Sequence, residues 1–321
     1  MRPMHVVWDQ ITRADWRGFA PENCALQQSW PYGEAVRRMG AQLRRAVVME
    51  DGACIGIAQV LVRDFRLGTC ALISRGPIWR SDVSTETKRA GLRMLRRSLP
   101  GSGVKLLLHT GAQDLSAGIP LISPAHLAVL DLSTNQDALR RGLHGKWRNR
   151  LVRAESSGLD LRNRAAAFAS IADLIARDQA QQRRKGFRNL PPEFLHAWDA
   201  RGGKMRLFEA RHNGECLAAM LFVDHAPGVS YQIGWTSQAG RENSAHHLLL
   251  WSAICHFSRK GHRQLDLGLL DTNSAPGLAR FKLGAGAKVL KLAPTRLIAT
   301  GWGDVLARPY AAAITRTGTA L

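Results

Sequence analysis

The residues best suited to chemistry in this sequence follow a predicted strand, Tyr231–Trp235. A polar turn comes next, with Gly240 available for a tight bend and Asn243 or Ser244 as a helix N-cap. The helix expected to begin near Ser244 is apolar nearly all round, so it should be buried between layers. Its first N–H groups would face a ligand crevice, where such groups bind phosphate and other anions.

Two carboxylates flank the end of the strand that follows this helix. Gly261 stops the helix, and Gln264–Gly268 resumes as a strand that contains Asp266 and is followed by Asp271. A carboxylate at a strand end can accept a proton directly or through water. Asp271 suits that role better, because Asp266 lies between apolar residues and could serve only to tie down a loop.

The other reactive side chains of this stretch do not match a known kind of site. His246, His247, Cys255 and His256 are potential metal ligands, but their spacing matches no zinc pattern. Neighbours in sequence also point to different faces of a helix, so Cys255 and His256 cannot act as nucleophile and base. The sequence therefore predicts no metal site and no cysteine–histidine nucleophile in this stretch.

Two similar hairpins begin the elements that must position these residues. Apolar, β-rich runs meet at Asp51-Gly52 and again at Asn213-Gly214, and both dipeptides are strong hairpin signals. Each hairpin leads into a third strand, a helix and a fourth strand. The elements are Leu43–Met49, Ala53–Val62, Cys70–Ser74, Glu86–Leu99 and Val104–His109, then Lys204–Arg211, Glu215–Val223, Ser230–Trp235, Ala245–Arg259 and Gln264–Gly268. This order predicts a duplicated α/β domain with a period of roughly half the chain.

The charge of the chain indicates an anionic partner. Among 321 residues, 45 Lys and Arg face 25 Asp and Glu, which gives a net charge of +20. Nucleic acid, a nucleotide-linked substrate and a membrane surface all fit, and an arginine-rich solvated surface is the alternative. Five scattered cysteines predict buried thiols in a reducing compartment. Because there is no signal core and no transmembrane segment of ~18 apolar residues, we expect a cytoplasmic protein that makes at most transient contact with a membrane surface.

Basic helices are predicted between the two halves. Leu139, Leu143, Trp147 and Leu151 recur every four residues and predict one amphipathic helix, and a second helix is expected over 168–182. Basic residues on or after these helices are candidate contacts to nucleic-acid phosphates, namely Arg148, Arg150, Arg153, Arg183, Arg184 and Lys185. Trp147 could stack on a base, but its place in the apolar stripe favours burial.

Several short motifs, taken in order, resemble the FemAB family, whose members contain two GNAT-type acetyltransferase domains in tandem. They are Leu26-Gln27-Gln28-Ser29-Trp30, Ser74-Arg75-Gly76-Pro77, Lys146-Trp147-Arg148-Asn149-Arg150, the hairpin at Gly214, Asp266-Leu267-Gly268, and Phe281-Lys282 ahead of Gly284. Each motif alone is weak, and their order is fairly specific. The resemblance implies an α/β fold of two tandem GNAT-like domains with mixed central sheets. We place them at 1–135 and 136–321, the second carrying the donor site and the basic linking helices.

The resemblance also implies a reaction. Family members of known activity transfer an aminoacyl group from tRNA to an amine of a cell-wall precursor in peptidoglycan synthesis, and other branches are associated with acyl-CoA. The amine attacks an ester or thioester carbonyl, an oxyanion develops and one proton leaves the nitrogen. We therefore expect an N-acyltransferase that works in the cleft between its two halves. It would bind no resident cofactor, since the donor is itself a substrate.

Individual residues receive roles from the same resemblance. Lys282 resembles the family's catalytic lysine, which stabilises the oxyanion or holds the donor's terminal phosphate and ribose; a solvated lysine capping a short helix is the alternative. Arg188 resembles the arginine that grips the phosphates of a nucleotide-linked acceptor. A second acceptor contact, a lysine in the family, falls at Val36, so Arg37 and Arg38 are the nearest basic groups. This departure argues against a muramyl-peptide acceptor.

The polar turn over 237–244 occupies the place of the family's pyrophosphate-binding turn. Acetyl-CoA enzymes usually carry Arg/Gln-x-x-Gly-x-Gly/Ala there, and only Gly240 and Arg241 match. The candidate donor-binding residues are Gly240, Arg241, Asn243 and Ser244. An aminoacyl-tRNA donor is therefore favoured over an acyl-CoA. An acyl-CoA-dependent enzyme acting on an amino sugar, amino acid or lipid-linked amine stays open, as does a non-catalytic RNA-binding protein on a GNAT scaffold.

Overall fold

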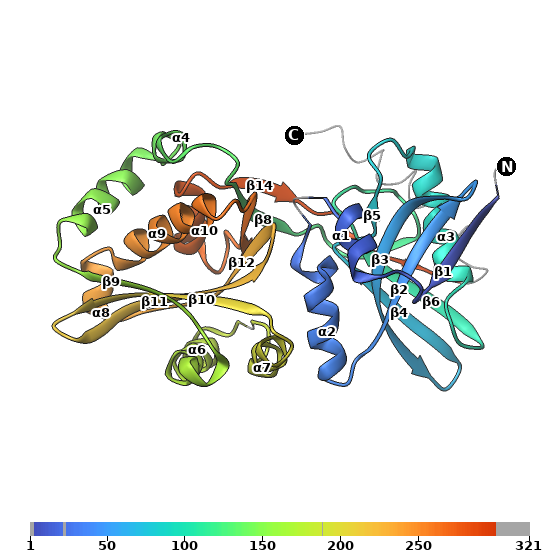
Figure 1. Cartoon of the computed structure of the whole chain (residues 1–321), viewed down its shortest axis with the longest axis horizontal. Helices are drawn as coiled ribbons and strands as arrows, with labels where there is room; N and C mark the ends of the chain where they lie inside the picture. Colours follow the sequence, from blue (N-terminus) through green and yellow to red (C-terminus); the bar gives the residue numbers. More distant parts are fainter. Residues whose placement is uncertain (1–2, 22–23, 188, 300–321) are drawn as a thin grey trace. The chain divides into compact units, whose positions relative to one another are not determined.

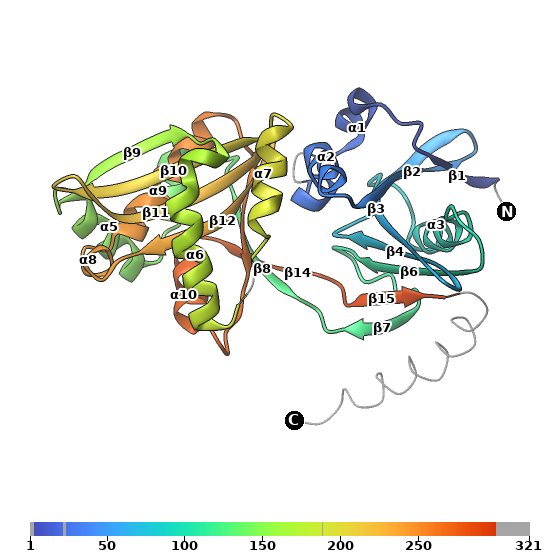
Figure 2. The same cartoon turned by 90° about the horizontal axis from the view of Figure 1, so that it is seen from below.

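A computed structural model describes residues 3–21, 24–187 and 189–299 (Figures 1 and 2). Its contacts divide the chain into two compact units. Of the described residues, the first unit takes 3–21, 40–125 and 291–299, and the second takes 24–39, 126–187 and 189–290. Within the described residues, no helix is long and apolar enough to cross a membrane.

The first unit is built on a mixed sheet with the strand order β1-β2-β3-β4-β6-β15-β7, and β5 pairs with β3. Its elements are β1 (Met4–Trp8), α1 (Arg13–Phe19), β2 (Gln42–Glu50), β3 (Ala53–Phe65), β4 (Gly68–Ser74), β5 (Ile78–Trp79), α3 (Thr85–Arg97), β6 (Val104–Thr110), β7 (Ile119–Ile122) and β15 (Thr295–Ile298). The parallel pair, β4 and β6, stays in register from Gly68↔Val104 to Ser74↔Thr110. Leu92 and Leu95 of α3 are fully buried in the core of this unit.

The second unit has a mixed sheet with the order β14-β8-β13-β12-β11-β10-β9. Its elements are η1 (Leu26–Gln28), α2 (Trp30–Arg38), β8 (His126–Asp131), α4 (Gln136–Arg141), α5 (Gly145–Glu155), β9 (Asp160–Ala165), η2 (Phe168–Ile171), α6 (Ala172–Lys185), α7 (Pro192–Ala200), β10 (Lys204–His212), β11 (Glu215–His225), β12 (Gly228–Thr236), α8 (Gln238–Glu242), α9 (Ala245–Arg259), β13 (Gln264–Leu269), α10 (Pro276–Gly284) and β14 (Lys288–Lys291). Figure 1 shows α5, α9 and α10 on one face of this sheet and α6 and α7 on the other.

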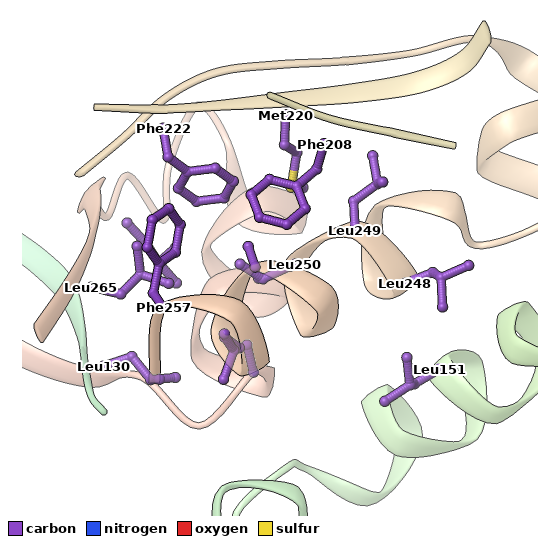
Figure 3. Close-up of a cluster of buried hydrophobic side chains, with 14 of the residues drawn as sticks. Leu130, Leu151, Phe208, Met220, Phe222, Leu248, Leu249, Leu250, Phe257 and Leu265 are labelled. Carbon is purple, nitrogen blue, oxygen red and sulfur yellow. The ribbon is translucent and has the colours of Figure 1, made fainter. Parts of the chain in front are cut away.

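The core of the second unit lies between its sheet and α9 (Figure 3). Phe208 and Phe222 of the sheet contact each other edge to face, with ring centroids 5.5 Å apart. Phe257 of α9 packs on Phe222 at the same distance, 5.5 Å. Because α9 is apolar nearly all round, it buries Leu249 and Leu250 as well, as the sequence predicts.

The predicted duplication is confirmed. In both units an antiparallel hairpin is followed by a third strand, a helix and a fourth strand parallel to the third. The prediction of an α/β protein with two mixed sheets is therefore correct.

The two units are not separated by a single boundary near residue 135, where the sequence suggested one. β8 pairs with β13, for example Asp131 with Gln264, and so belongs to the second sheet. β15 pairs with β6 and β7 and so belongs to the first sheet. α2 packs on α7, with Tyr32 and Phe194 rings 5.5 Å apart, so this early helix joins the second unit.

The basic helix expected over 139–151 is two helices in the structure. α4 ends at Gly142, and α5 begins after His144, whose N–H bonds to Gly284 O (2.9 Å). Leu143, Trp147 and Leu151 are nevertheless buried together in the core, which confirms the burial expected for Trp147. The apolar period survives the break because both pieces pack on the same core.

Candidate functional site

The two central strands of the second sheet separate part-way along their length. β12 and β13 pair in parallel from Gly228↔Gln264 to Ser230↔Asp266, although β12 continues to Thr236. The remaining stretch, Tyr231–Thr236, is called the β12 edge below. The equivalent strands of the first unit, β4 and β6, stay paired over the whole of β4. In the second unit the parallel strands therefore stop pairing early, and the carbonyls of Gly234, Trp235 and Thr236 accept hydrogen bonds from the side chains of Gln181, His246 and Arg241.

Bulges accompany this separation. β12 has an extra residue, Gln232, between its pairs with Leu221 and Phe222 of β11. β13 shifts register near Gly268, whose φ of 79° suits glycine. Asp266 Oδ1 accepts a hydrogen bond from Gly268 N (2.7 Å) and so fixes this irregular backbone. Because bulges increase local twist, they direct the two strands apart.

Lys282 of α10 lies at the end of β13 and is only 5% exposed. Its Nζ donates a hydrogen bond to Leu269 O (2.7 Å). Burial lowers the pKa of Lys282 to about 8, and the nearby Asp266 carboxylate opposes that shift. An ideal Cβ at Gly268 would lie 3.8 Å from Nζ, so glycine keeps a side chain away from the ammonium. The alternative of a solvated lysine does not fit this burial.

Trp147 of α5 holds the part of α10 that carries Lys282. Its Nε1 donates to Phe281 O (3.0 Å), and its ring lies 6.1 Å from the Phe281 ring. A Cβ at Gly284 would come within 2.8 Å of Trp147 Cδ1, so glycine permits this close packing. Phe281 also contacts His247, at 5.1 Å between ring centroids. The contacts of Trp147 with α10 were not predicted, because the apolar stripe indicated burial and nothing more.

The two candidate proton acceptors have structural partners. Asp271 is exposed, and its Oδ1 accepts from the N–H groups of Asn273 (2.9 Å) and Ser274 (2.8 Å). Hydrogen bonds from Ser274 lower the pKa of Asp271, which makes it a poor base. Asp266 is 7% exposed and stabilises the bulge at Gly268.

The turn over 237–244 forms the short helix α8 rather than an open loop. Its backbone N–H groups bond within the turn, from Gly240 to Ser237 Oγ (3.0 Å), Arg241 to Ser237 O (3.1 Å), Asn243 to Ala239 O (3.0 Å) and Ser244 to Arg241 O (3.0 Å). The Arg241 guanidinium bonds to Gln238 Oε1 (2.8 Å) and Thr236 O (3.1 Å). The backbone N–H groups of the four residues predicted to bind the acyl donor are thus already hydrogen-bonded within the turn.

Cations surround the first turn of α9. Burial lowers the pKa of both His246 and His247 to about 4, so both rings are neutral at pH 7. Arg241 and Lys185 further lower the pKa of His246, and Arg150 further lowers that of His247. Three of the predicted basic residues therefore act on one helix terminus. In residues 3–21, 24–187 and 189–299, no three His, Cys, Asp or Glu side chains gather as a metal ion would require.

The remaining predicted basic residues are spread more widely. Arg148 bonds to Arg141 O (2.8 Å) and Leu143 O (3.1 Å) and so ties α4 to α5. Arg37 pairs with Glu34 at 3.6 Å. The exposed residues include Arg38, Arg153, Arg183, Arg184 and Lys185. Arg188 lies outside the described residues. Val36, which stands where the resemblance expected a lysine, is buried.

One carboxylate at the β12 edge was missed by the sequence reasoning. Asp178 of α6 is 3% exposed, and burial raises its pKa. Burial, with a smaller contribution from the Asp178 charge, raises the pKa of Tyr231, the first residue of this edge. Asp178 lies in a polar helix and resembles its solvated neighbours. The only sequence signal for a bonded Asp178 is Gln182 four residues later, on the same helix face; Gln182 Nε2 donates to Asp178 Oδ2 (2.6 Å).

Comparison with known proteins places these features in a wider fold. Residues 140–284 match the model of the acetyltransferase (GNAT) domain. The fold is similar to the crystal structure of FemX, at 14% identity over 91% of this chain and 96% of that chain, with a TM-score of 0.69. A tandem GNAT protein from the clavulanic acid biosynthesis pathway is similar at 13% identity over 93% and 99%, with a TM-score of 0.52. Comparison with curated protein sequences gave no match. The tandem GNAT fold is thus shared across very different sequences.

Proposed function

We propose that this protein, a member of the GNAT superfamily, transfers an aminoacyl group from tRNA to an amine acceptor and so forms an amide. The observation that carries the proposal is the buried Lys282 ammonium where β13 leaves β12. An ammonium in such a poorly solvated position is little screened, so it stabilises a nearby developing oxyanion strongly.

The reaction needs no covalent intermediate on the protein. The acceptor amine attacks the ester carbonyl of the donor, and the C–N bond forms as negative charge collects on the carbonyl oxygen. Lys282 Nζ stabilises that oxygen, and the ribose oxygen then leaves with a proton while the nitrogen gives one up. Backbone groups in the first half of the β12 edge, residues 231–233, would orient the acyl group, as an added strand is oriented at a sheet edge.

The closed turn over 237–244 favours tRNA as the donor. A CoA pyrophosphate is usually held by free backbone N–H groups before a helix, and the N–H groups of Gly240, Arg241, Asn243 and Ser244 bond within the turn. The cations near α9, Arg150 and Lys185, can instead meet the phosphates of an RNA 3′ end. An acyl-CoA donor remains the second candidate. Because aminoacyl-tRNA is made in the cytoplasm, we place the reaction there.

The acceptor is an amine, with a cell-wall precursor as the first candidate. Arg188, Arg37 and Arg38 are the proposed contacts to its phosphates, by the resemblance described above. Buried Val36 cannot supply the charge that the family lysine provides, so among cell-wall precursors a muramyl nucleotide has less support than a lipid-linked one.

Labelled donors test this proposal. The purified protein is incubated separately with charged tRNA and with acetyl-CoA, each labelled on the acyl group, together with a panel of amines that includes a cell-wall precursor, a lipid-linked amine and an amino sugar. We expect an acid-stable amide label from charged tRNA. Label from acetyl-CoA alone would contradict the tRNA donor. If tRNA binds but neither label moves, the protein is an RNA-binding protein and the enzyme proposal fails.

Removing the positive charges at the end of α6 should weaken tRNA binding most at low salt. Arg183, Arg184 and Lys185 are exposed, and each contact to a single-strand phosphate contributes about 0.7 to the slope of log affinity against log salt. Replacing all three by alanine should therefore reduce that slope by roughly 2 in filter-binding or anisotropy titrations. The matched control replaces three exposed arginines of the first unit, Arg63, Arg66 and Arg97, by alanine. Equal slopes in both triple variants would contradict the assignment.

A further inference from the structure

A buried carboxylate without a cationic partner among the described residues lies in α6. Asp178 is 3% exposed, in a chain whose net charge is +20. Its hydrogen-bond donors in the described part are two neutral carboxamides, Gln182 Nε2 (2.6 Å to Oδ2) and Asn189 Nδ2 (3.3 Å to each oxygen). Burial raises the pKa of Asp178 because these bonds only partly replace the lost water. A carboxylate in this state gains more than a solvated one from a cation that reaches it.

The contacts of α6 place Asp178 at the β12 edge. Gln181 Nε2 donates to Gly234 O (3.3 Å), and the Arg177 guanidinium lies 4.0 Å from the centre of the Trp235 ring. Asp178 itself acts on Tyr231. The two contacts fall on Gly234 and Trp235, which lie beyond the pairing of β12 with β13. The helix that carries Asp178 therefore lies against the stretch where the proposed acyl group would bind.

The helices that carry the two charged groups lie on opposite faces of the second sheet. Figure 1 shows α6, which carries Asp178, on one face and α10, which carries Lys282, on the other. A substrate seated at the edge would have an ammonium on one side and a carboxylate on the other. The first suits a carbonyl oxygen that becomes negative, and the second suits a positively charged nitrogen.

We propose that Asp178 binds the ammonium group of a primary-amine substrate at the β12 edge. The inference rests on the proposed function, since it assumes that an acyl group lies there. The ammonium has two sources, the α-amine of an aminoacyl donor or the amine of the acceptor, and both are cations near pH 7. Two carboxylate oxygens offer about four acceptor positions, so an ammonium can bind while Gln182 and Asn189 stay bonded. Asp178 would thereby select substrates with a charged amine over acylated ones.

Binding of paired probes tests this without any turnover. The donor arm compares 3′-deoxy-3′-glycylaminoadenosine with its N-acetyl derivative, and the acceptor arm compares n-butylamine with n-butanol. We expect the charged member of one pair to bind wild-type protein at least roughly tenfold more tightly, because hydrogen bonds between charged groups are strong. Asp178→Asn should abolish that preference, as measured by calorimetry or by ligand-observed NMR. The control is Asp173→Asn, which alters an exposed carboxylate of the same helix.

Each outcome bears on the inference. A preference in the donor arm assigns the carboxylate to the aminoacyl group, and one in the acceptor arm assigns it to the amine that is acylated. No preference in either arm, or a preference that persists in Asp178→Asn, overturns the inference. Asp178→Ser, which removes the charge with less volume, serves as the second variant if Asp178→Asn does not fold. Failure of label transfer from charged tRNA leaves these binding results intact, so the two proposals fail separately.

Discussion

Replacing Lys282 by methionine is expected to reduce amide formation by about 10²–10³-fold while the protein stays folded. Methionine fills a similar volume, so the packing of α10 should survive. The ammonium that Leu269 O holds in place is lost, and with it the charge that we propose to stabilise the oxyanion. Initial rates of label transfer measure the effect, and circular dichroism checks the fold. Lys260→Met, at an exposed lysine after α9, is the matched control and should transfer at the wild-type rate. Equal rates for the two variants would remove Lys282 from the mechanism.

The same substitution should change how stability depends on pH. The pKa of Lys282 is lowered to about 8 in the folded protein, against about 10.4 in an unfolded chain. Between these values the unfolded chain binds more protons, so the free energy of unfolding rises with pH, by about 3 kcal/mol in all. Below pH 8 both states are protonated and the cost of burying the charge is present in full. Urea titrations from pH 7 to pH 10.5 should show this rise in the wild type and not in Lys282→Met. A wild-type rate that falls above about pH 8 would agree with a catalytic ammonium.

Replacing Trp147 by alanine should cost about 3–5 kcal/mol of stability and also lower the activity of the molecules that remain folded. The indole is buried, donates to Phe281 O and packs against Gly284, so its loss leaves a cavity beneath α10. Urea unfolding measures the stability, and label transfer per folded molecule measures the activity.

Phe208→Ala separates the two effects of Trp147. Phe208 is fully buried in the same core, on the sheet rather than against α10, so its loss should cost a similar free energy of unfolding with little change in transfer per folded molecule. Trp147→Phe adds a milder test, since it keeps most of the packing and loses the bond to Phe281 O, worth about 1 kcal/mol. If Trp147→Ala and Phe208→Ala lose activity equally, Trp147 does not position Lys282.

The sequence predicts those parts of the fold that depend on local signals. Asp51-Gly52 and Asn213-Gly214 each define a hairpin within a few residues, and both hairpins are present. The helix over 139–151 was expected as one piece, because its apolar period continues across Gly142. Whether such a glycine bends or ends a helix depends on what it packs against, here Gly286 and the residues around Gly284. The spacing of apolar residues does not predict tertiary contacts of this kind.

The candidate site depends even more strongly on tertiary contacts that the sequence does not predict. The resemblance singles out Lys282, but its position depends on Leu269 O, which accepts from Nζ, and on Trp147, which bonds to the neighbouring Phe281; both are distant in sequence. The turn over 237–244 has the composition of an anion site, yet Ser237 closes it into a short helix. Asp178 looks like any acidic residue of a polar helix, because the burial of one side of α6 comes from β12 and Asn189. The sequence identifies ionisable side chains that could react, but only tertiary packing determines which of them are buried and desolvated.

The uninterrupted pairing of β4 with β6 suggests that the two units differ in their ability to bind a substrate between their parallel strands. Because β4 and β6 stay paired from Gly68 to Ser74, the first unit leaves no gap between these two strands for an acyl chain. Giving the first unit a similar site would require shortening the pairing of β4 with β6 from seven residue pairs to the three that β12 and β13 form in the second unit. Substitutions that change substrate preference should accordingly cluster in the second unit. The sheet of the first unit should tolerate replacement by another stable sheet of similar size and shape.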